Sequence, residues 1–470
     1  MNEERRPHVA FLPTPGMGHL LPISELAKLL VDRHRFSVTI ITFAEFANKT
    51  QDTFLAALPS SISSVSLPAV PLSDLPANAR IETRISLAAA RSVHALRSIL
   101  LDLQYSTRLV AFVGDLFSAV ADDAAKAAGV PYYVFIPTNF LFLALMLELP
   151  ALDAAMTCEF WQLPEPVRLP GFVPIPGPEI LHPLQDRKND CYKWVVENAR
   201  RYRQAEGIIV NTFDAIEPEA AKLLAGEEHG RPPVYAVGPL IRSKAISGEE
   251  GALCMKWLDA QPPASVVFVC FGSAGTLSRE QTHELALGLE SSGQRFLWVG
   301  RSPSDVSAAE SYFTARSSAD PLFFLPDGFL DRTKEVGMVV PSWAPQIEVL
   351  GHAATGGFLS HCGWNSTLES VAHGVPMISW PLFAEQKMNA VQLVEGVRVA
   401  LRPAAREDGV HDRKEIARVV RELMEGEEGK VVRRRAKELE AAAAAALGEE
   451  GPSSRALATM AERWRSSSPA

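Results

Sequence analysis

The chain has 470 residues, which is longer than one ordinary hydrophobic core supports, so two domains of roughly 200 residues each are expected. Its hydrophobic fraction of 47% and charged fraction of 21% are typical of a soluble globular protein. The formal net charge of -9 at pH 7 argues against nucleic acid as a partner, because binding a phosphate backbone requires clustered Lys and Arg side chains.

Neither the N-terminus nor an internal run predicts a secretory or membrane segment. The opening stretch MNEERRPHVAFLPTPG holds only a short apolar run, which Pro13 and Pro15 interrupt. The best internal candidate, FLFLALMLELPALD, carries Glu148 and Pro150 and falls short of the roughly 20 apolar residues that a membrane helix needs. Five cysteines without a C-x-x-C pair are typical of reduced thiols. We therefore expect a cytoplasmic protein without a membrane partner, and a monomer.

Strand and helix patterns alternate along the chain. Short apolar runs rich in β-branched and aromatic residues predict strands at residues 9–14, 37–43, 109–117, 132–138, 207–213, 265–273, 295–300, 337–343, 356–361 and 377–383. Helical patterns lie between most of them, at residues 21–34, 119–129, 279–293 and 364–374. Apolar strands separated by amphipathic helices indicate parallel sheets covered on both faces. Two such series predict an α/β chain with two doubly wound, Rossmann-like halves.

A domain boundary is expected near residue 245. The stretch SKAISGEEG at residues 243–251 is polar and has no periodicity. The domains are therefore expected at residues 1–245 and 246–470, with the ligand in a cleft that faces the carboxyl ends of the strands. The helical pattern from Pro452 to Trp464 is free to pack back on the N-terminal domain.

The stretch SHCGWNSTLE, residues 360–369, crosses from a predicted strand into a predicted helix. Helix N-termini present free N–H groups and a partial positive charge, which suit a phosphate. Residues 343–386 contain no Lys or Arg, so a diphosphate there would meet backbone N–H groups and the side chains of His361, Asn365 and Ser366. The lack of a phosphate-binding Lys excludes P-loop chemistry.

The same stretch allows three other interpretations. A metal site at His361 and Cys362 lacks the further ligands at regular spacing that zinc requires. Cys362 as a nucleophile is less typical than a structural cysteine at a strand end. A helix cap formed by Asn365 or Ser366 is the strongest alternative and stays open.

Two further residues support a nucleotide site. Glu369 lies one turn after Asn365, so its carboxylate is expected on the same helix face, where it could accept hydrogen bonds from two ribose hydroxyls. Trp343 directly follows a predicted strand, where its indole could stack on a base. Ordinary core packing is the alternative for this Trp.

A possible acid-base pair lies in the N-terminal half. The stretch TPGMGHLLP contains G-x-G, but Leu21 occupies the position of the third glycine, so the dinucleotide fingerprint fails. His19 follows the first predicted strand and opens a helix, whose dipole disfavours the imidazolium and keeps a neutral base available. Asp115 ends a strand and needs a partner, for which an imidazole is suited. The alternative for His19 is a simple helix cap.

The block WAPQIEVLGHAATGGFLSHCGWNSTLESVAHGVPMISWPLFAEQ, residues 343–386, closely resembles the 44-residue signature of plant secondary-product UDP-glycosyltransferases. The stretches TPGMGHLLP, RIETRIS, VGDLF, QDRKND, AEGIIVNTF, FGSAGTLS, QRFLWVGRSP and AEQKMNAV extend the resemblance over almost the whole chain and are similar to the phenol-directed branch of that family. The resemblance implies a GT-B fold, in which two Rossmann-like domains face a cleft. It assigns acceptor binding to the N-terminal domain and the UDP-sugar mainly to the C-terminal one.

The resemblance also implies a role for each matching residue. Trp343 would stack on uracil, and Ala344 and Gln346 would bind the edge of the base. Glu369 would hold the ribose hydroxyls. The remaining donor residues would hold the diphosphate (Ser273, His361, Asn365 and Ser366) or border the glucose (Trp364, Glu385 and Gln386).

The family pattern bears on the choice of sugar and on catalysis. Many members have Asp where this chain has Glu385, and Gln386 in place of His favours UDP-glucose over UDP-galactose by resemblance. His19 and Asp115 would form a catalytic dyad, in which His19 removes the proton of the acceptor hydroxyl and Asp115 orients the imidazole. Position and character suggest four acceptor-pocket candidates, each with core packing as its alternative: Glu82, Phe117, Phe140 and Phe142.

The expected function is inverting transfer of glucose from UDP-glucose to small phenols, giving β-glucosides and UDP in secondary metabolism or xenobiotic detoxification. We expect no metal and no cofactor beyond the co-substrate UDP-glucose, because the chain lacks the Asp-x-Asp motif that binds metal in the other major glycosyltransferase fold. Two alternatives stay open: a sugar-nucleotide epimerase or hydrolase on the same fold, and a non-catalytic UDP-sugar-binding protein.

Overall fold

A computed structural model describes most of the chain: residues 6–76, 78–226, 230–242, 249–273, 275–304 and 322–466. The boundary expected near residue 245 lies outside the described residues. The chain divides into two compact units. Unit 1 comprises Met1–Pro178, Pro183–Ile241 and Ala445–Ala470, and unit 2 comprises Glu179–His182 and Arg242–Ala444.

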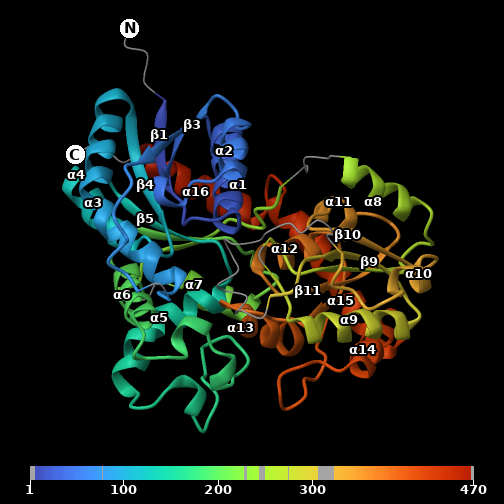
Figure 1. Cartoon of the computed structure of the whole chain (residues 1–470). Coiled ribbons are helices and arrows are strands. Elements are labelled where there is room, and N and C mark those ends of the chain that lie inside the picture. The colour runs from blue at the N-terminus through green and yellow to red at the C-terminus, as the bar shows by residue number, and fades with distance from the viewer. Residues whose placement is uncertain are drawn as a thin grey trace. The chain divides into compact units, whose positions relative to one another are not determined.

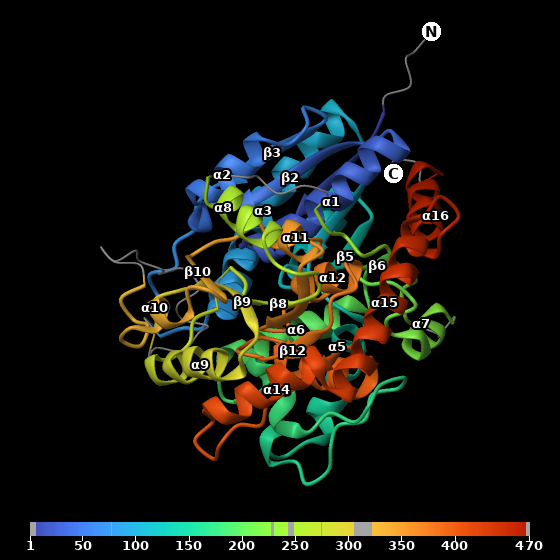
Figure 2. The ribbon, with the colours of Figure 1, turned by 90° about the vertical axis from the view of Figure 1, so that its right-hand side faces the viewer.

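Unit 1 is built on a parallel sheet of seven strands in the order β3-β2-β1-β4-β5-β6-β7 (Figures 1 and 2). The strands are β1 (Pro7–Leu12), β2 (Ser37–Phe43), β3 (Ile62–Leu67), β4 (Arg108–Asp115), β5 (Tyr132–Ile136), β6 (Gly207–Val210) and β7 (Val234–Ala236). The sequence patterns did not predict β3, because three of the six residues in ISSVSL are Ser. Only its two end residues, Ile62 and Leu67, are buried, as suits a strand at the sheet edge.

The helices of unit 1 cover both faces of this sheet, with α1 on one face and α3 and α4 on the other (Figure 1). They are α1 (Met17–His34), α2 (Lys49–Ala56), α3 (Ile81–Ser106), α4 (Asp122–Ala128), α5 (Phe140–Ala155), α6 (Asp190–Tyr202), α7 (Pro218–Ala225) and α16 (Pro452–Ser466). Short 3₁₀ turns are η1 (Ala44–Phe46), η2 (Ala119–Ala121), η3 (Phe160–Gln162), η4 (Gly177–Glu179) and η5 (His182–Leu184). The apolar run at FLFLALMLELPALD forms α5, which is buried along its first three turns.

Unit 2 repeats the same architecture with a parallel sheet in the order β10-β9-β8-β11-β12-β13. Its strands are β8 (Val266–Cys270), β9 (Arg295–Gly300), β10 (Gly337–Pro341), β11 (Thr355–Ser360), β12 (Met377–Ser379) and β13 (Ala400–Leu401). Its α-helices are α8 (Glu249–Asp259), α9 (Arg279–Ser292), α10 (Phe329–Thr333), α11 (Gln346–Leu350), α12 (Trp364–Ala372), α13 (Gln386–Val391), α14 (Arg413–Glu425) and α15 (Glu427–Leu447). A short π-helix, η7 (Gln392–Gly396), follows α13.

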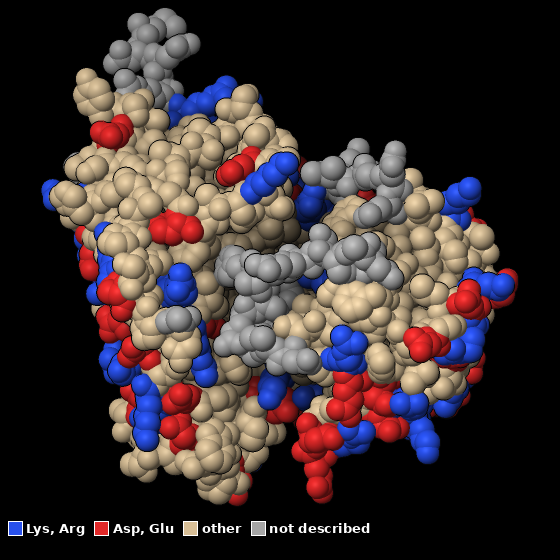
Figure 3. Space-filling model, in the orientation of Figure 1, with Lys and Arg blue, Asp and Glu red and all other residues tan. Residues whose placement is uncertain are grey.

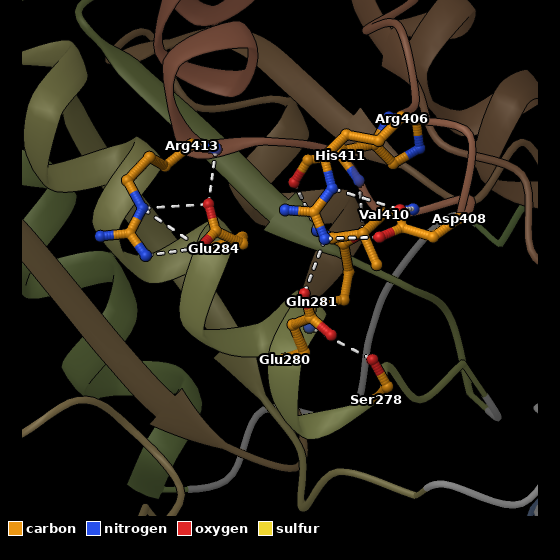
Figure 4. Close-up of polar contacts among 9 residues, drawn as sticks. All are labelled: Ser278, Glu280, Gln281, Glu284, Arg406, Asp408, Val410, His411 and Arg413. Carbon is orange, nitrogen blue, oxygen red and sulfur yellow. Dashed lines mark hydrogen bonds and ion pairs between the residues drawn. The ribbon is translucent and has the colours of Figure 1, made fainter.

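A polar network ties α9 to the segment that leads into α14 (Figure 4). Gln281 accepts a hydrogen bond from the backbone N–H of His411 (2.8 Å) and donates one to its carbonyl oxygen (3.1 Å). The buried carboxylate of Glu284 receives the backbone N–H (2.7 Å) and the guanidinium of Arg413, which lowers the pKa of Glu284. These bonds satisfy polar groups that the packing of the two helices removes from water.

The surface of the described residues carries both signs of charge. On the face drawn in Figure 3, Lys and Arg side chains are interspersed with Asp and Glu, and no broad basic surface is visible among the residues coloured there. Among the described residues, no helix combines the length and the apolar character that a membrane crossing requires.

The C-terminal helix α16 belongs to unit 1, where it packs beside α1 on the sheet (Figures 1 and 2). Trp464 is fully buried, and its ring meets Tyr133 edge-on at 5.2 Å and Phe36 at 6.1 Å between centroids. Arg465 donates to the carbonyl oxygen of His34 at the end of α1 (2.7 Å). Helix α16 therefore completes the core of the unit that contains β1.

We expect Trp464→Ala to destabilise unit 1 by about 3–5 kcal/mol, because the change leaves a large cavity between α16 and the sheet. The midpoint of urea unfolding, followed by far-UV circular dichroism, measures the effect. Trp161→Ala is the matched control, since Trp161 lies in the same unit and is 54% exposed. Equal midpoints for the two variants would show that the Trp464 ring does not support the fold.

Candidate functional site

The first candidate site lies in unit 1, where the strand order of the sheet reverses. β1 and β4 are parallel neighbours with Leu12 opposite Gly114, so the residues that follow these strands meet at one edge. His19 lies in the first turn of α1, and Asp115 ends β4. The His19 Nδ1 and Asp115 Oδ2 atoms are 2.9 Å apart. The sheet therefore brings together the two residues that the sequence suggested as a pair.

Hydrogen bonds fix the carboxylate of Asp115 in place. The side chain is fully buried, and Oδ2 accepts a second bond from the backbone N–H of Thr14 (3.1 Å). Oδ1 accepts from the backbone N–H of Leu116 (2.5 Å). Because an ionised carboxylate only accepts, the proton of a neutral His19 ring lies on Nδ1, and Nε2 carries the basic lone pair.

Of the four acceptor-pocket candidates, Phe117 lies near His19, with 6.4 Å between the ring centroids. Phe140 and Phe142 are buried in the first turn of α5. Glu82 is in the first turn of α3, and burial raises its pKa. The role of all four residues in acceptor binding stays a prediction.

Glu217 is a buried carboxylate that the sequence analysis did not single out. It accepts hydrogen bonds from the backbone N–H groups of Phe140 (3.0 Å) and Leu141 (3.1 Å) and from the hydroxyl of Thr212 (3.1 Å). Burial raises the pKa of Glu217 to about 7. It thus anchors the N-terminus of α5, which carries two of the acceptor candidates. The acidic residue in AIEP gave no periodic signal, and two of its three partners, Phe140 and Leu141, lie more than 70 residues earlier.

The second candidate site lies in unit 2, again where the strand order reverses. β8 and β11 are parallel neighbours with Cys270 opposite Ser360, so Ser273 and His361 follow adjacent strands. α12 begins at Trp364, and its N-cap, Gly363, provides no side-chain cap. The first turn of α12 also contains no acidic residue. The helix cap by Asn365 or Ser366, which the sequence left open, is not formed, and the backbone N–H groups at this end suit an anion.

Two glycines make room for the His361 ring. A Cβ atom on Gly272 would lie 2.5 Å from Cε1 of His361, and one on Gly363 would lie 2.4 Å from Nε2. Burial, together with the nearby charge of Arg301, lowers the pKa of His361 to about 4. The ring is therefore neutral at pH 7 and can offer one hydrogen-bond donor.

Gln346, Ser366 and Glu369 form one hydrogen-bonded group on the neighbouring helices α11 and α12. Nε2 of Gln346 donates to Ser366 Oγ (2.9 Å) and to Glu369 Oε2 (2.6 Å). Burial raises the pKa of Glu369 to about 7, and the bond from Gln346 acts in the opposite direction. Gln346 thus links a hydroxyl in the first turn of α12 to a carboxylate one turn later, and their role in nucleotide binding stays a prediction.

The remaining predicted donor residues occupy the same edge of the unit 2 sheet or the start of α13. Trp343 follows β10 and is 41% exposed, so it is available for stacking, whereas Ala344 and Trp364 are buried. Glu385 is the N-cap residue of α13. Oε1 of Gln386 accepts from the backbone N–H groups of Leu382 and Phe383, at 2.9 and 3.0 Å.

Asn389 and Arg301 are residues of this site that sequence reasoning missed. Asn389 donates to the carbonyl oxygen of Cys362 (3.0 Å) and to Glu385 Oε1 (3.4 Å), which joins α13 to the turn before α12. Arg301 follows β9 and influences His361 electrostatically. Residues 343–386 contain no Lys or Arg, so Arg301 brings a cation to this site from outside that stretch.

Cys362 has a structural role. Its thiol is buried and lies 3.1 Å from Ser379 Oγ, and burial raises its pKa to about 11. A thiol that stays protonated at neutral pH does not act as a nucleophile. Among the described residues, no group of three or more His, Cys, Asp or Glu side chains is arranged to hold a metal ion.

The comparison with known proteins agrees with this geometry. A family model described as UDP-glucoronosyl and UDP-glucosyl transferase matches residues 251–408. Hydroquinone glucosyltransferase of Rauvolfia serpentina is 53% identical over 462 residues, which cover 98% of each chain. Two solved structures are also similar. Phytolacca americana UGT2 in complex with UDP-2fluoro-glucose and pterostilbene has a TM-score of 0.89 and 46% identity, covering 98% of this chain and 100% of that one.

The second structure is a complex of 3,4-dichloroaniline with a UDP-glucosyltransferase from Polygonum tinctorium that is capable of glucosylating indoxyl. It has a TM-score of 0.92 and 48% identity, covering 98% of this chain and 99% of that one. The two parallel-sheet units share the GT-B fold of these plant enzymes. With these identities over nearly its full length, the chain belongs to the family of UDP-glucoronosyl and UDP-glucosyl transferases.

Proposed function

We propose that this chain transfers glucose from UDP-glucose to the hydroxyl of small phenolic acceptors, with inversion at the anomeric carbon. The products are a β-glucoside and UDP. The names of its relatives support the donor and the acceptor class: one acts on hydroquinone, and another was solved with a UDP-glucose analogue and the phenol pterostilbene.

The observation that carries the proposal is the hydrogen bond between His19 and buried Asp115. Binding of a sugar nucleotide requires no general base, whereas transfer to a hydroxyl does. In the proposed reaction, Nε2 of His19 takes the hydroxyl proton, and the phenolic oxygen bonds to the anomeric carbon. The bond from that carbon to the diphosphate oxygen breaks, and UDP leaves with the electron pair. Asp115 stabilises the imidazolium that forms.

We assign the donor to the second site. Trp343 stacks on uracil, with Ala344 and Gln346 at the edge of the base, and Glu369 binds the ribose hydroxyls. The diphosphate lies at the N-terminus of α12, where preorganised donors can stabilise the charge of the departing UDP. Ser273, His361, Asn365 and Ser366 bind this diphosphate, and Trp364, Glu385 and Gln386 border the glucose.

We also infer a monomer that works in the cytoplasm and needs no metal. The lack of an Asp-x-Asp motif supports the last point, since the helix N-terminus and neutral side chains already suit a diphosphate. Gel filtration with light scattering tests the monomeric state, and activity in excess chelator tests the independence of metal.

The proposed function predicts glucoside formation when the protein is incubated with UDP-glucose and a panel of phenols, anilines and thiols. Mass spectrometry identifies the products, and proton NMR determines their anomeric configuration. We expect phenolic β-glucosides and one UDP per glucoside. UDP release without an acceptor would support the hydrolase alternative, and UDP-sugar binding without turnover would support the non-catalytic one.

His19→Ala should lower kcat by roughly 10²- to 10⁴-fold, the usual contribution of a general base, and should leave the affinity for UDP within about twofold. Steady-state kinetics and calorimetry measure the two quantities. His94→Ala is the matched control, because His94 is exposed on α3 of the same unit. Turnover equal to that of the control would remove His19 from the mechanism.

Trp343→Ala should weaken UDP binding by roughly 5- to 150-fold, because base–aromatic stacking contributes about 1–3 kcal/mol. Calorimetric titration with UDP measures the loss, and the exposed Trp161→Ala variant serves as the control. An unchanged dissociation constant would mean that the indole only packs against its protein neighbours.

A further inference from the structure

Arg301 directly follows β9, which lies between β10 and β8 in the unit 2 sheet. Gly300, the last residue of β9, pairs with Pro341 of β10, and Trp298 pairs with Val269 of β8. A residue just beyond β9 is therefore flanked by the segments that follow both neighbouring strands. Those segments carry two groups of donor-site residues.

The guanidinium of Arg301 binds both segments. Its Nη1 donates to the carbonyl oxygen of Ser273, which follows β8. Its Nη2 donates to the carbonyl oxygen of Ser342, which follows β10, over 3.2 Å. Two nitrogens of one rigid, planar fork thus hold two loops that are about 70 residues apart in the sequence, a geometry that the single ammonium of Lys does not reproduce.

Both loops pass through the left-handed region of backbone conformation, which Gly272 adopts freely and Ser342 adopts at a cost. Ser342 has a φ of 63°, in the left-handed region that a residue with a Cβ atom adopts at a cost. This turn sets the direction of the next residue, Trp343. Gly272, before Ser273, has a φ of 72° and lies against the His361 ring, where a Cβ would come within 2.5 Å. Arg301 therefore fixes the turn that presents the indole and the loop that packs on the imidazole.

The charge of Arg301 also acts in this part of the unit. Burial is the main cause of the low pKa of His361, and the positive charge of Arg301 lowers that pKa further. Residues 343–386 supply no cation of their own. A positive charge held by backbone carbonyls near His361 would attract a diphosphate without forming a P-loop.

We propose that Arg301 is a positioning residue of the sugar-nucleotide site, which clamps the Ser273 loop to the Ser342–Trp343 turn and supplies positive potential to the diphosphate. The proposal rests on the proposed function only for the identity of the ligand. Arg301 would then affect uracil binding by holding the Ser342–Trp343 turn. It would affect diphosphate binding separately, by its positive charge.

The test compares uridine and UDP binding to the full chain by calorimetry for the wild type, Arg301→Gln and Arg301→Lys. Arg301→Gln should weaken UDP binding about 10- to 100-fold, the range for a lost hydrogen bond to a charged group, and uridine binding by a smaller factor. Arg301→Lys keeps the charge but not the fork. It should restore the wild-type ratio of UDP to uridine affinity while uridine binding stays weakened.

The kinetic constants separate this role from a loss of structure. In Arg301→Gln, KM for UDP-glucose should rise by the same factor as the UDP dissociation constant, and KM for the phenol should stay within about twofold. Arg421→Gln is the matched control, because Arg421 of α14 also donates to a backbone carbonyl in unit 2, that of Ser291 (2.9 Å). The control should bind UDP as the wild type does.

Wild-type affinity for both uridine and UDP in Arg301→Gln would overturn the proposal. If that variant does not fold, Arg301→Lys decides the question, since unchanged uridine affinity in it would exclude the clamp. A protein that binds UDP but forms no glucoside would overturn the proposed function and leave these binding comparisons unaffected. The two failures are therefore distinguishable.

Discussion

Both candidate sites depend on the point at which the strand order of a parallel sheet reverses. On either side of that point, successive connections leave the sheet toward opposite faces, so the carboxyl ends of the two strands are not covered by the same helix. In unit 1 the reversal falls between β1 and β4, and in unit 2 between β8 and β11. His19 and Asp115 follow the first pair of strands, and Ser273 and His361 follow the second.

Burial has different consequences for the ionisable groups of the two sites. In unit 1, buried Asp115 is stabilised by two backbone N–H groups and His19, so its charge is available to orient an imidazole and to stabilise its protonated form. In unit 2, burial lowers the pKa of His361, so that its ring is a neutral hydrogen-bonding group. The two His residues thus differ in their surroundings: His19 contacts a buried carboxylate, whereas the ring of His361 is kept neutral.

The positions of glycines and of a fork-shaped side chain decide how closely the loops of unit 2 approach one another. Gly272 and Gly363 leave space for the ring of His361, and the guanidinium of Arg301 joins the loops on either side of β9. A site assembled from loops requires such bridges, because a parallel sheet fixes where each strand ends but not how the following residues turn.

The α/β class and the two-sheet organisation were predictable from the sequence, and the candidate site residues were proposed from it. Apolar periodicity and the signature at residues 343–386 are local properties of the chain. Only the tertiary structure showed that α16 completes unit 1, that β3 joins the sheet edge, and which distant backbone groups Glu217, Asn389 and Arg301 bind. The physical reason is that these contacts join residues far apart in sequence, so strand order and register, rather than neighbouring residues, bring them together.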